Sequence, residues 1–188
     1  MDTLTDPDNI VSEFRRIRGS QESQDHGETQ ENQISGELIW QEELLEIAKN
    51  IWPGAFERLC QRLLREAGFI NVKVTGQSGD GGIDGTGVLK INRMVSFHVY
   101  FQAKRYRDAV PASVVRNFRG AMVGRAGKGM IITTGRFTRD AQGEAYREGA
   151  DPVDLIDGIQ LKEMLRDFEI GIETEEIVRI NNDYFESL

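Results

Sequence analysis

Three polar residues in the middle of the chain, Asp84, Gln102 and Lys104, have the types and spacing that hydrolysis of a phosphodiester would need. That reaction requires an attacking water that is oriented or deprotonated, and it requires positive charge beside the phosphate as negative charge develops. A carboxylate can hold a divalent cation, and a lysine supplies fixed positive charge and a hydrogen-bond donor. The three residues therefore predict a metal-dependent hydrolytic centre.

Strand geometry explains how these residues could meet. Gln102 and Lys104 are two positions apart, so in a strand they project from the same face, while Ala103 points to the opposite face, which we expect to be core. Asp84 lies where the glycine-rich segment GQSGDGGIDGTG enters the next strand. If the two strands pair as a hairpin, the side chains converge at one end. The main-chain carbonyl of Ala103 would then be a further oxygen ligand, and Mg²⁺ prefers oxygen ligands.

The elements that must position the site follow from the spacing of apolar residues and from turn signals. The expected helices cover residues 38–47, 53–67, 110–122, 138–150 and 157–168. The expected strands are INVKVTG, VLKI, MVSFHVYFQAKRY, KGMIITT and PVDLID, with a turn near Asn92 and Arg93 between the second and third. This order predicts a mixed α/β sandwich with helices on both faces of the sheet.

Composition divides the chain into three parts. Residues 1–36 include GSQESQDHGETQENQISG, a polar and acidic run that cannot bury enough apolar surface to fold, and we expect a flexible segment or linker there. Residues 37–172 form the expected catalytic domain. Residues 173–188 form an acidic tail in which EEIVRINNDYFESL could supply an edge strand and a short turn.

The distribution of charge points to a polyanionic partner despite a net charge of −8. Residues 1–50 hold 4 basic and 12 acidic residues, residues 51–147 hold 16 and 7, and residues 148–188 hold 3 and 12. A basic centre between acidic ends suits nucleic acid. A solvated basic face with no partner is the alternative that charge alone leaves open.

Several classes of protein and site are disfavoured. No run of about 18 apolar residues is present, and MDTLTDPDNI lacks the apolar core of a secretory signal. Cys60 is the only cysteine and lies in the apolar-periodic run FERLCQRLL, so we expect an inert core thiol and a reducing, cytoplasmic location. His26 and His98 have no partners at ligand spacing, which argues against structural zinc.

A series of motifs in fixed order carries a family resemblance. The motifs are AFERLCQRLLREAGF, VTGQSGDGGIDG, VYFQAKRY, KGMIITTGRFTRDA and LIDGIQLKEML, and together they span about residues 53–171. The chain resembles the Mrr-type restriction endonuclease domain of the PD-(D/E)xK nuclease superfamily. The resemblance implies a restriction-endonuclease-like three-layer sandwich with a mixed central sheet. It also implies an endonuclease for double-stranded DNA that uses Mg²⁺ or Mn²⁺ and acts against foreign or modified DNA. Because a double-strand cut usually needs two active sites, we expect a homodimer.

The same resemblance implies roles for matching residues. Asp84 corresponds to the metal-binding aspartate, and Lys104 to the lysine that positions or activates the attacking water. Gln102 stands where the superfamily more often has Asp or Glu. Glu57 matches the family's helical glutamate, which reaches toward metal-bound waters. Asp80 lies in the glycine turn before Asp84, and its role stays open.

Departures from the family pattern define the alternatives. Gln102 is neutral, so the site holds less negative charge for a metal, and Glu57 could compensate. A catalytically inactive DNA-binding or regulatory module is therefore one alternative, and a structure-specific nuclease for branched DNA is another. The start of the chain shows no recognisable winged-helix reader, so target recognition is expected to need a separate domain or subunit.

Other residues are candidates for contact with DNA. Arginines suit phosphate because the guanidinium is planar and can bind two oxygens, and the candidates are Arg105, Arg107, Arg116 and Arg119. Each could equally be a solvated surface charge. Thr133, Thr134 and Thr138 lie at a strand-to-helix junction and could bind an anion. A plain N-cap is the competing role for Thr138.

Overall fold

The structure is a computed structural model that describes residues 40–75, 82–125, 127–173, 180–181, 184–185 and 187–188. The chain divides into two units, Met1–Trp40 and Gln41–Leu188, and every element discussed below lies in the second. The expectations for residues 1–36, for Asp80 and for most of residues 173–188 lie outside the described residues. The boundaries at residues 36 and 172 therefore stay predictions.

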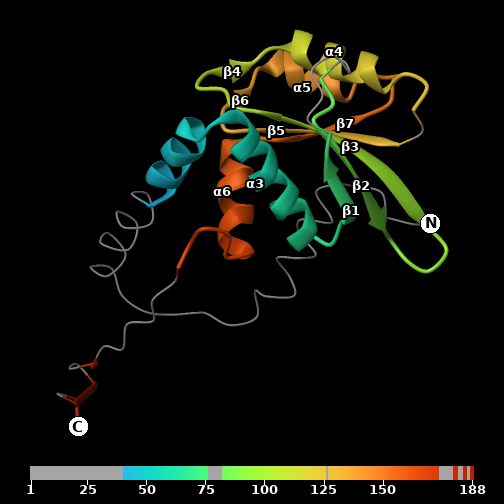
Figure 1. The fold of residues 1–188 in the computed structure, drawn as a ribbon. Helices are drawn as coiled ribbons and strands as arrows, with labels where there is room; N and C mark the ends of the chain where they lie inside the picture. Colours follow the sequence, from blue (N-terminus) through green and yellow to red (C-terminus); the bar gives the residue numbers. More distant parts are fainter. Residues whose placement is uncertain (1–39, 76–81, 126, 174–179, 182–183, 186) are drawn as a thin grey trace. The chain divides into compact units, whose positions relative to one another are not determined.

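A five-stranded mixed sheet forms the middle layer (Figure 1). Its spatial order is β1-β2-β3-β5-β7, with β1–β2–β3 antiparallel and β3–β5–β7 parallel. The strands are β1 (Ile70–Val74), β2 (Gly85–Lys90), β3 (Ser96–Lys104), β5 (Lys128–Thr133) and β7 (Val153–Ile156). The mixed sheet that the sequence predicted is confirmed.

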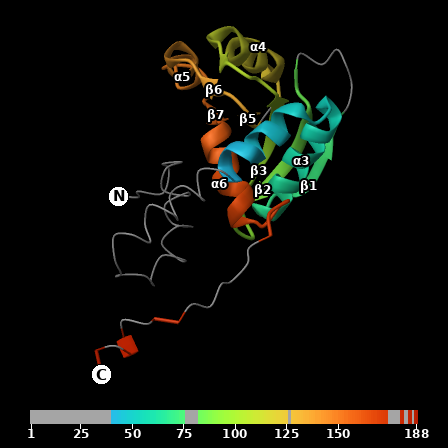
Figure 2. The same cartoon turned by 90° about the vertical axis from the view of Figure 1, so that its left-hand side faces the viewer.

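The connections between parallel strands decide where the helices lie. Helix α4 (Ala112–Met122) links β3 to β5, and α5 (Arg139–Ala145) links β5 to β7. Both crossovers run in the same direction along the sheet, from β3 to β5 and from β5 to β7. Because crossovers between parallel strands are almost always right-handed, both helices cover the same face. Helices α3 (Pro53–Glu66) and α6 (Gly158–Asp167) cover the other face (Figures 1 and 2). The result is the expected three-layer sandwich.

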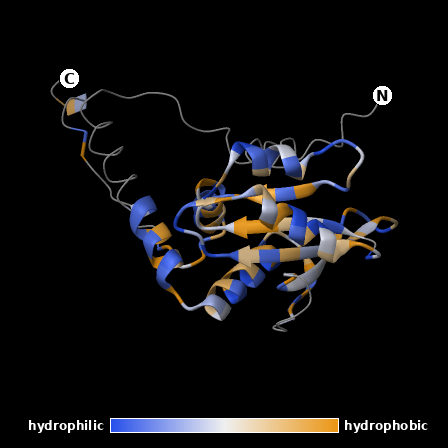
Figure 3. Ribbon diagram, turned by 90° about the horizontal axis from the view of Figure 1, so that it is seen from above, coloured by the Kyte–Doolittle hydropathy of each residue, from blue (hydrophilic) through white to orange (hydrophobic). Residues whose placement is uncertain are grey.

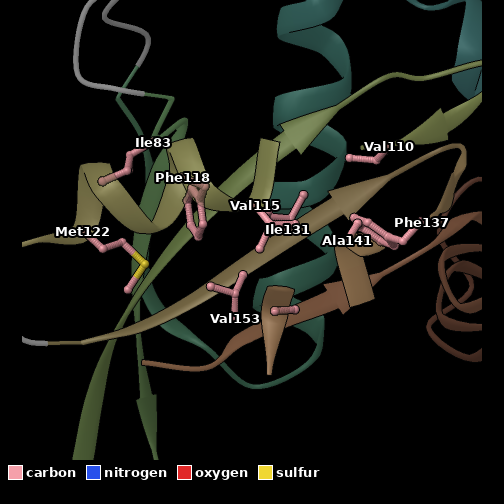
Figure 4. Packing of buried hydrophobic residues seen from close by; sticks show 10 residues of the cluster. Ile83, Val110, Val115, Phe118, Met122, Ile131, Phe137, Ala141 and Val153 are labelled. Carbon is pink, nitrogen blue, oxygen red and sulfur yellow. The ribbon is translucent and has the colours of Figure 1, made fainter. Parts of the chain in front are cut away.

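Each face of the sheet has its own apolar core. Side chains of consecutive strand residues point to opposite faces, and so Ile131 packs with α4 and α5 while Ile132 packs with α3 and α6. Figure 4 shows the first core, in which Val115 and Phe118 of α4 lie over Ile131 and Val153. In Figure 3 the strands carry apolar stretches and the helices mix apolar and polar residues. That pattern is typical of a sheet buried on both faces.

Helix α3 matters most for the site because it carries Glu57. Pro53 occupies its first turn, where the missing N–H costs nothing. Its buried residues are Phe56, Cys60, Leu63 and Leu64, a spacing that places one apolar stripe against the sheet. Glu57 follows Phe56 and is half-buried.

Some details differ from the sequence-based expectations. Two short strands, β4 (Ala109–Val110) and β6 (Arg136–Phe137), pair in parallel and were not predicted. The helix expected over 110–122 begins at Ala112, and the one expected over 138–150 ends at Ala145. Two-residue strands and helix ends depend on tertiary contacts more than on local spacing. Within the described ranges, none of the helices has the length and apolar character needed to cross a bilayer.

Candidate active site

The β2–β3 hairpin brings the predicted residues together. Gly85, the first residue of β2, pairs with Phe101, and the main-chain N–H of Asp84 donates to the Phe101 carbonyl at 2.9 Å. Lys104 is the last residue of β3, at the same end of the hairpin. The expected pairing of the two strands is therefore confirmed, and it places Asp84 beside the end of β3.

The Asp84 carboxylate is fixed by the main chain of β3. Its Oδ2 atom accepts a hydrogen bond from the Ala103 N–H at 2.7 Å. A hydrogen bond to a carboxylate is stronger than one to a neutral acceptor, so it holds the Asp84 side chain in place. In an extended strand the N–H and C=O of one residue point to the same side, so the Ala103 carbonyl also faces the side of Asp84. The Ala103 side chain packs into the core with α3 and α6, as expected.

Gln102 has a buried amide with one unsatisfied atom. Gln102 is 4% exposed, and its Nε2 atom donates a hydrogen bond to the Gly82 carbonyl. Its Oε1 is buried and has no hydrogen-bond partner among the described residues. Such an acceptor carries an uncompensated desolvation cost of about 1–3 kcal/mol. A cation bound there would satisfy this oxygen, so the residues present fit a metal site.

The donor set suits a hard cation with few protein ligands. Across the residues that the structure describes, no group of three or more His, Cys, Asp or Glu side chains is placed to hold a metal. The oxygens that remain are those of Asp84, the Gln102 amide and the Ala103 carbonyl. Mg²⁺ commonly binds to one or two carboxylates and keeps several waters, so this small set suits Mg²⁺ better than zinc.

Glu57 lies within electrostatic reach of the strand residues. Burial raises the pKa of Glu57, the Asp84 carboxylate raises it further, and Lys104 and Arg58 act in the opposite direction. Two carboxylates that disfavour each other's ionisation are a common feature of cation sites, because a bound cation relieves their repulsion. The role that the resemblance implies for Glu57 stays a prediction, and its interaction with Asp84 and Lys104 motivates it.

Replacement of Glu57 by glutamine is expected to stabilise the metal-free protein at neutral and alkaline pH. The folded protein holds this proton more tightly than the unfolded chain, so wild-type stability falls as pH rises from about 4.3 through the raised pKa. Glutamine does not ionise and escapes this loss. Melting temperatures measured in chelator should rise for Glu57→Gln near pH 8 and converge with wild type near pH 4.

Glu66→Gln is the matched control, because it removes an exposed carboxylate from the last turn of the same helix. It should show no such gain at alkaline pH. Equal melting temperatures of Glu57→Gln and wild type near pH 8 would show that Glu57 is not electrostatically strained in the folded protein.

Cys60 is not a nucleophile. It is fully buried, and burial raises the pKa of its thiol, with Asp84 and Glu57 raising it further. A thiol held neutral in this way is chemically inert. The expectation of a core thiol is confirmed.

The Arg105 side chain hydrogen-bonds to another segment of the protein, directly after the end of β3, instead of extending into solvent. Its Nη1 donates to the main-chain carbonyls of Lys49, at 3.2 Å, and of Ile51. These carbonyls belong to the end of the helical residues 41–50 and the turn that leads into α3. Because Arg105 directly follows Lys104 in the chain, these hydrogen bonds link the end of β3 to the segment that leads into α3, the helix that carries Glu57. Sequence reasoning assigned Arg105 to phosphate contact and did not detect this link.

Removal of the Arg105 guanidinium is expected to slow DNA cleavage without weakening DNA binding. Arg105→Ala leaves two carbonyls without their donor and lets Lys104 shift relative to Glu57, and a displacement of about 1 Å can cost a hundredfold in rate. Cleavage should fall roughly ten- to a hundredfold. Duplex affinity in EDTA should stay near the wild-type value.

Arg107→Ala is the paired control, since the Arg107 side chain is 67% exposed and contacts side-chain atoms, Asn50 Oδ1 at 2.6 Å and Glu46 Oε2 at 3.8 Å. Arg107→Ala should weaken DNA binding and reduce the slope of log affinity against log salt concentration by about one. Should Arg105→Ala weaken binding in this way instead, Arg105 contacts DNA as first predicted.

The other two arginines also differ in their surroundings. The Arg119 side chain is only 12% exposed and donates to Glu144 Oε1 at 2.5 Å and to the carbonyls of Glu144, Ala145 and Asp151. It therefore joins α4 to α5 and has few donors left for DNA. Arg116 is 54% exposed and lies 3.6 Å from Glu144. Phosphate contact remains a proposal for Arg107 and Arg116.

The threonines at the end of β5 have structural partners. The Thr134 hydroxyl donates to the Tyr106 carbonyl at 2.9 Å and accepts from the Tyr106 N–H at 3.1 Å. Thr138 caps α5 by accepting from the Ala141 N–H at 3.1 Å. Thr133 accepts from the Gly135 N–H at 3.1 Å. Since these groups already have partners and α5 is only 7 residues long, the anion site proposed for them is not supported.

A family profile described as a restriction endonuclease, the Mrr catalytic domain, matches residues 48–165. The type IV methyl-directed restriction enzyme EcoKMrr of Escherichia coli (strain K12) is 30% identical over 152 residues. That match covers 77% of this chain and 49% of the enzyme, so the chain spans about half the length of this relative.

Solved structures show the same fold. The MspJI restriction endonuclease, solved with a 27-mer oligonucleotide, superposes with a TM-score of 0.56 and 28% identity, over 78% of this chain and 34% of that one. The DNA modification-dependent restriction endonuclease AspBHI superposes with a TM-score of 0.60 and 24% identity, over 69% and 36%. The fold is therefore restriction-endonuclease-like, as the sequence predicted.

Proposed function

The chain belongs to the Mrr-type family of restriction endonuclease catalytic domains, and on that premise we propose that it is an endodeoxyribonuclease. The reaction is metal-dependent hydrolysis of phosphodiester bonds in double-stranded DNA. The cofactor is Mg²⁺, with Mn²⁺ as its substitute. The biological role is restriction of foreign or modified DNA.

One observation carries the proposal. A carboxylate fixed by a main-chain N–H, Asp84, lies beside the strand that holds Gln102, whose buried amide oxygen has no partner in the described part of the chain. Lys104 follows on the same strand, and Glu57 approaches from α3. A buried oxygen without a hydrogen-bond partner needs an explanation, and a bound cation is the one we propose for the Gln102 amide.

The residues of the chain divide the chemistry between them. Asp84, Gln102 and the Ala103 carbonyl would hold the cation, and Glu57 would act on it through water. When bound, a divalent cation supplies positive charge to the phosphate and lowers the pKa of water. Lys104 adds a second positive charge beside the scissile phosphate and orients the attacking water with its donors. Direct attack by water needs no covalent intermediate on the protein.

Relatives suggest the substrate class. EcoKMrr is named as methyl-directed, and MspJI was solved with an oligonucleotide. We therefore propose that duplex DNA carrying modified bases is the preferred substrate. A double-strand cut needs two catalytic centres, so the protein acts as a homodimer, and a separate domain or subunit selects the target. The buried free thiol of Cys60 fits a reducing compartment such as the cytoplasm.

A second candidate function rests on Gln102. A neutral amide in place of a carboxylate weakens the hold on a cation, and a domain of this fold that binds DNA without cutting it would have the same surface. In that case the protein should bind DNA and should not cut it when a divalent metal is added.

Substrate choice tests the proposal. Unmodified linear duplex, methylated linear duplex and a branched junction of the same sequence should be incubated separately with the wild-type protein and Mg²⁺ or Mn²⁺. Cutting of the linear duplexes, faster when methylated, is expected. If only the branched junction is cut, the protein is a structure-specific nuclease and not a restriction endonuclease. Binding of all three without cutting would favour the non-catalytic module.

A further inference from the structure

The hairpin formed by β2 and β3 extends beyond the rest of the sheet. Strand β1 follows β2 only as far as Val88, and β5 follows β3 only from Val99. Residues 89–97 therefore pair only with each other, in the register Leu89 with Phe97 and Lys90 with Ser96, and His98 at the base pairs with Val88. They form a two-stranded ribbon, called here the 89–98 ribbon, which leads to the green turn between β2 and β3 in Figure 1.

The tip of the 89–98 ribbon is ordered by its own hydrogen bonds. The Asn92 Oδ1 atom accepts from the N–H groups of Met94, at 2.8 Å, and Val95, at 2.9 Å. The Ile91 N–H donates to the Val95 carbonyl at 3.0 Å. The Asn92 side chain thus closes the turn through hydrogen bonds within the tip itself.

The ribbon exposes large apolar side chains. Met94 is 94% exposed, Ile91 54%, Val95 42% and Phe97 41%. A two-stranded ribbon alone is only marginally stable in water, and contiguous exposed apolar surface marks an interaction site. The apolar tip therefore points to a partner that buries it.

Charge selects the class of partner. No aspartate or glutamate occurs between Gly85 and Arg107, whereas that stretch holds Lys90, Arg93, Lys104 and Arg105. A symmetric contact between two copies of the tip would bring like charges together, which is unfavourable. A polyanion with apolar groups in reach is complementary, and duplex DNA has both. Its major groove admits a two-stranded ribbon and displays the 5-methyl groups of pyrimidines.

We propose that the 89–98 ribbon enters the major groove of the substrate duplex and contacts pyrimidine 5-methyl groups with Met94 and Ile91. Lys90 and Arg93 contact the flanking phosphates. This inference rests on the proposed function, because it assumes a DNA substrate. Strands β2 and β3 run from the tip to the candidate active site over 6 and 9 residues. At about 3.3 Å per residue, the ribbon contacts DNA roughly six to nine base pairs from the cut.

Replacing thymine by deoxyuridine removes only the methyl groups and tests the contact directly. Affinity in EDTA should be measured for two duplexes of about thirty base pairs, identical except that one carries deoxyuridine at every thymine. Wild type should bind the thymine duplex about fourfold more tightly for each methyl group contacted. Met94→Ser should lose this preference, and Arg93→Ala should keep it while binding both duplexes more weakly.

Val123→Ser is the matched control, since Val123 is 80% exposed and lies just after α4, outside the ribbon. It should keep the wild-type preference. Equal wild-type affinity for both duplexes would overturn the ribbon contact and leave the nuclease proposal standing. An unchanged preference in Met94→Ser would also overturn it. Failure to bind either duplex would count against both proposals. A sedimentation mass that halves in Met94→Ser would instead assign the tip to a second copy of the chain.

Discussion

Asp84→Asn is expected to reduce DNA cleavage by at least about a thousandfold while leaving the fold and DNA binding intact. Asparagine keeps an oxygen that can accept the Ala103 N–H, so the 2.7 Å hydrogen bond to β3 has a replacement. What is lost is the negative charge that holds a cation. Cleavage rates in Mg²⁺, melting temperature and duplex affinity in EDTA should be measured on the same preparation.

Asp108→Asn is the control for this substitution, because it removes an exposed carboxylate from the same basic part of the chain. It should cut DNA at the wild-type rate. Retention of more than about a tenth of wild-type activity by Asp84→Asn would mean that the charge of Asp84 is dispensable, and the site would need a different metal-binding residue.

Gly82→Ala is expected to reduce cleavage by roughly a hundredfold and to destabilise the fold by about 1–3 kcal/mol. Gly82 has a φ of 96°, which a residue with a Cβ rarely adopts. A Cβ there would also collide with the Gln102 Nε2 atom. The Gln102 amide must then move, and its unsatisfied oxygen leaves the position that we propose for metal binding. Cleavage kinetics and denaturant unfolding measure the two effects.

Gly68→Ala separates backbone strain from displacement of Gln102. Gly68 has a similar φ of 89°, and no described atom lies within 4 Å of the place its Cβ would occupy. This variant should lose about 1 kcal/mol of stability and keep its cleavage rate. If both variants lose cleavage equally, general destabilisation explains the loss and the position of Gln102 does not.

The central part of the site could be predicted because it depends on short-range geometry. Alternation along a strand places Gln102 and Lys104 on one face and Ala103 on the other, whatever the rest of the fold. Two strands with a turn between them form a hairpin, and that pairing brings Asp84 to the end of β3. The layers followed from the order of helices and strands, since parallel crossovers leave little choice of face.

The partners of individual arginines and threonines could not be predicted in the same way. Arg105 donates to carbonyls 54 and 56 positions away, and Arg119 to Glu144, 25 positions away. Main-chain carbonyls carry no signature in a sequence, so both residues resembled surface charges suited to phosphate. The partner of Thr134 could not be predicted for the same reason, because it is the main chain of Tyr106. The close contact of Gly82 with Gln102 did have a signal, the density of glycine before Asp84.

The most direct test of the account is cleavage of supercoiled plasmid by wild type and Lys104→Ala side by side, on unmodified and methylated DNA, with Mg²⁺, Mn²⁺ or EDTA. Lys104 ends β3 at the end of the hairpin where Asp84 lies, so we predict that wild type cuts with either metal and is inert in EDTA. Lys104→Ala should bind the plasmid but not cut it. Well-folded wild type that binds both plasmids and cuts neither with any metal would contradict the account and identify the domain as a non-catalytic DNA-binding module.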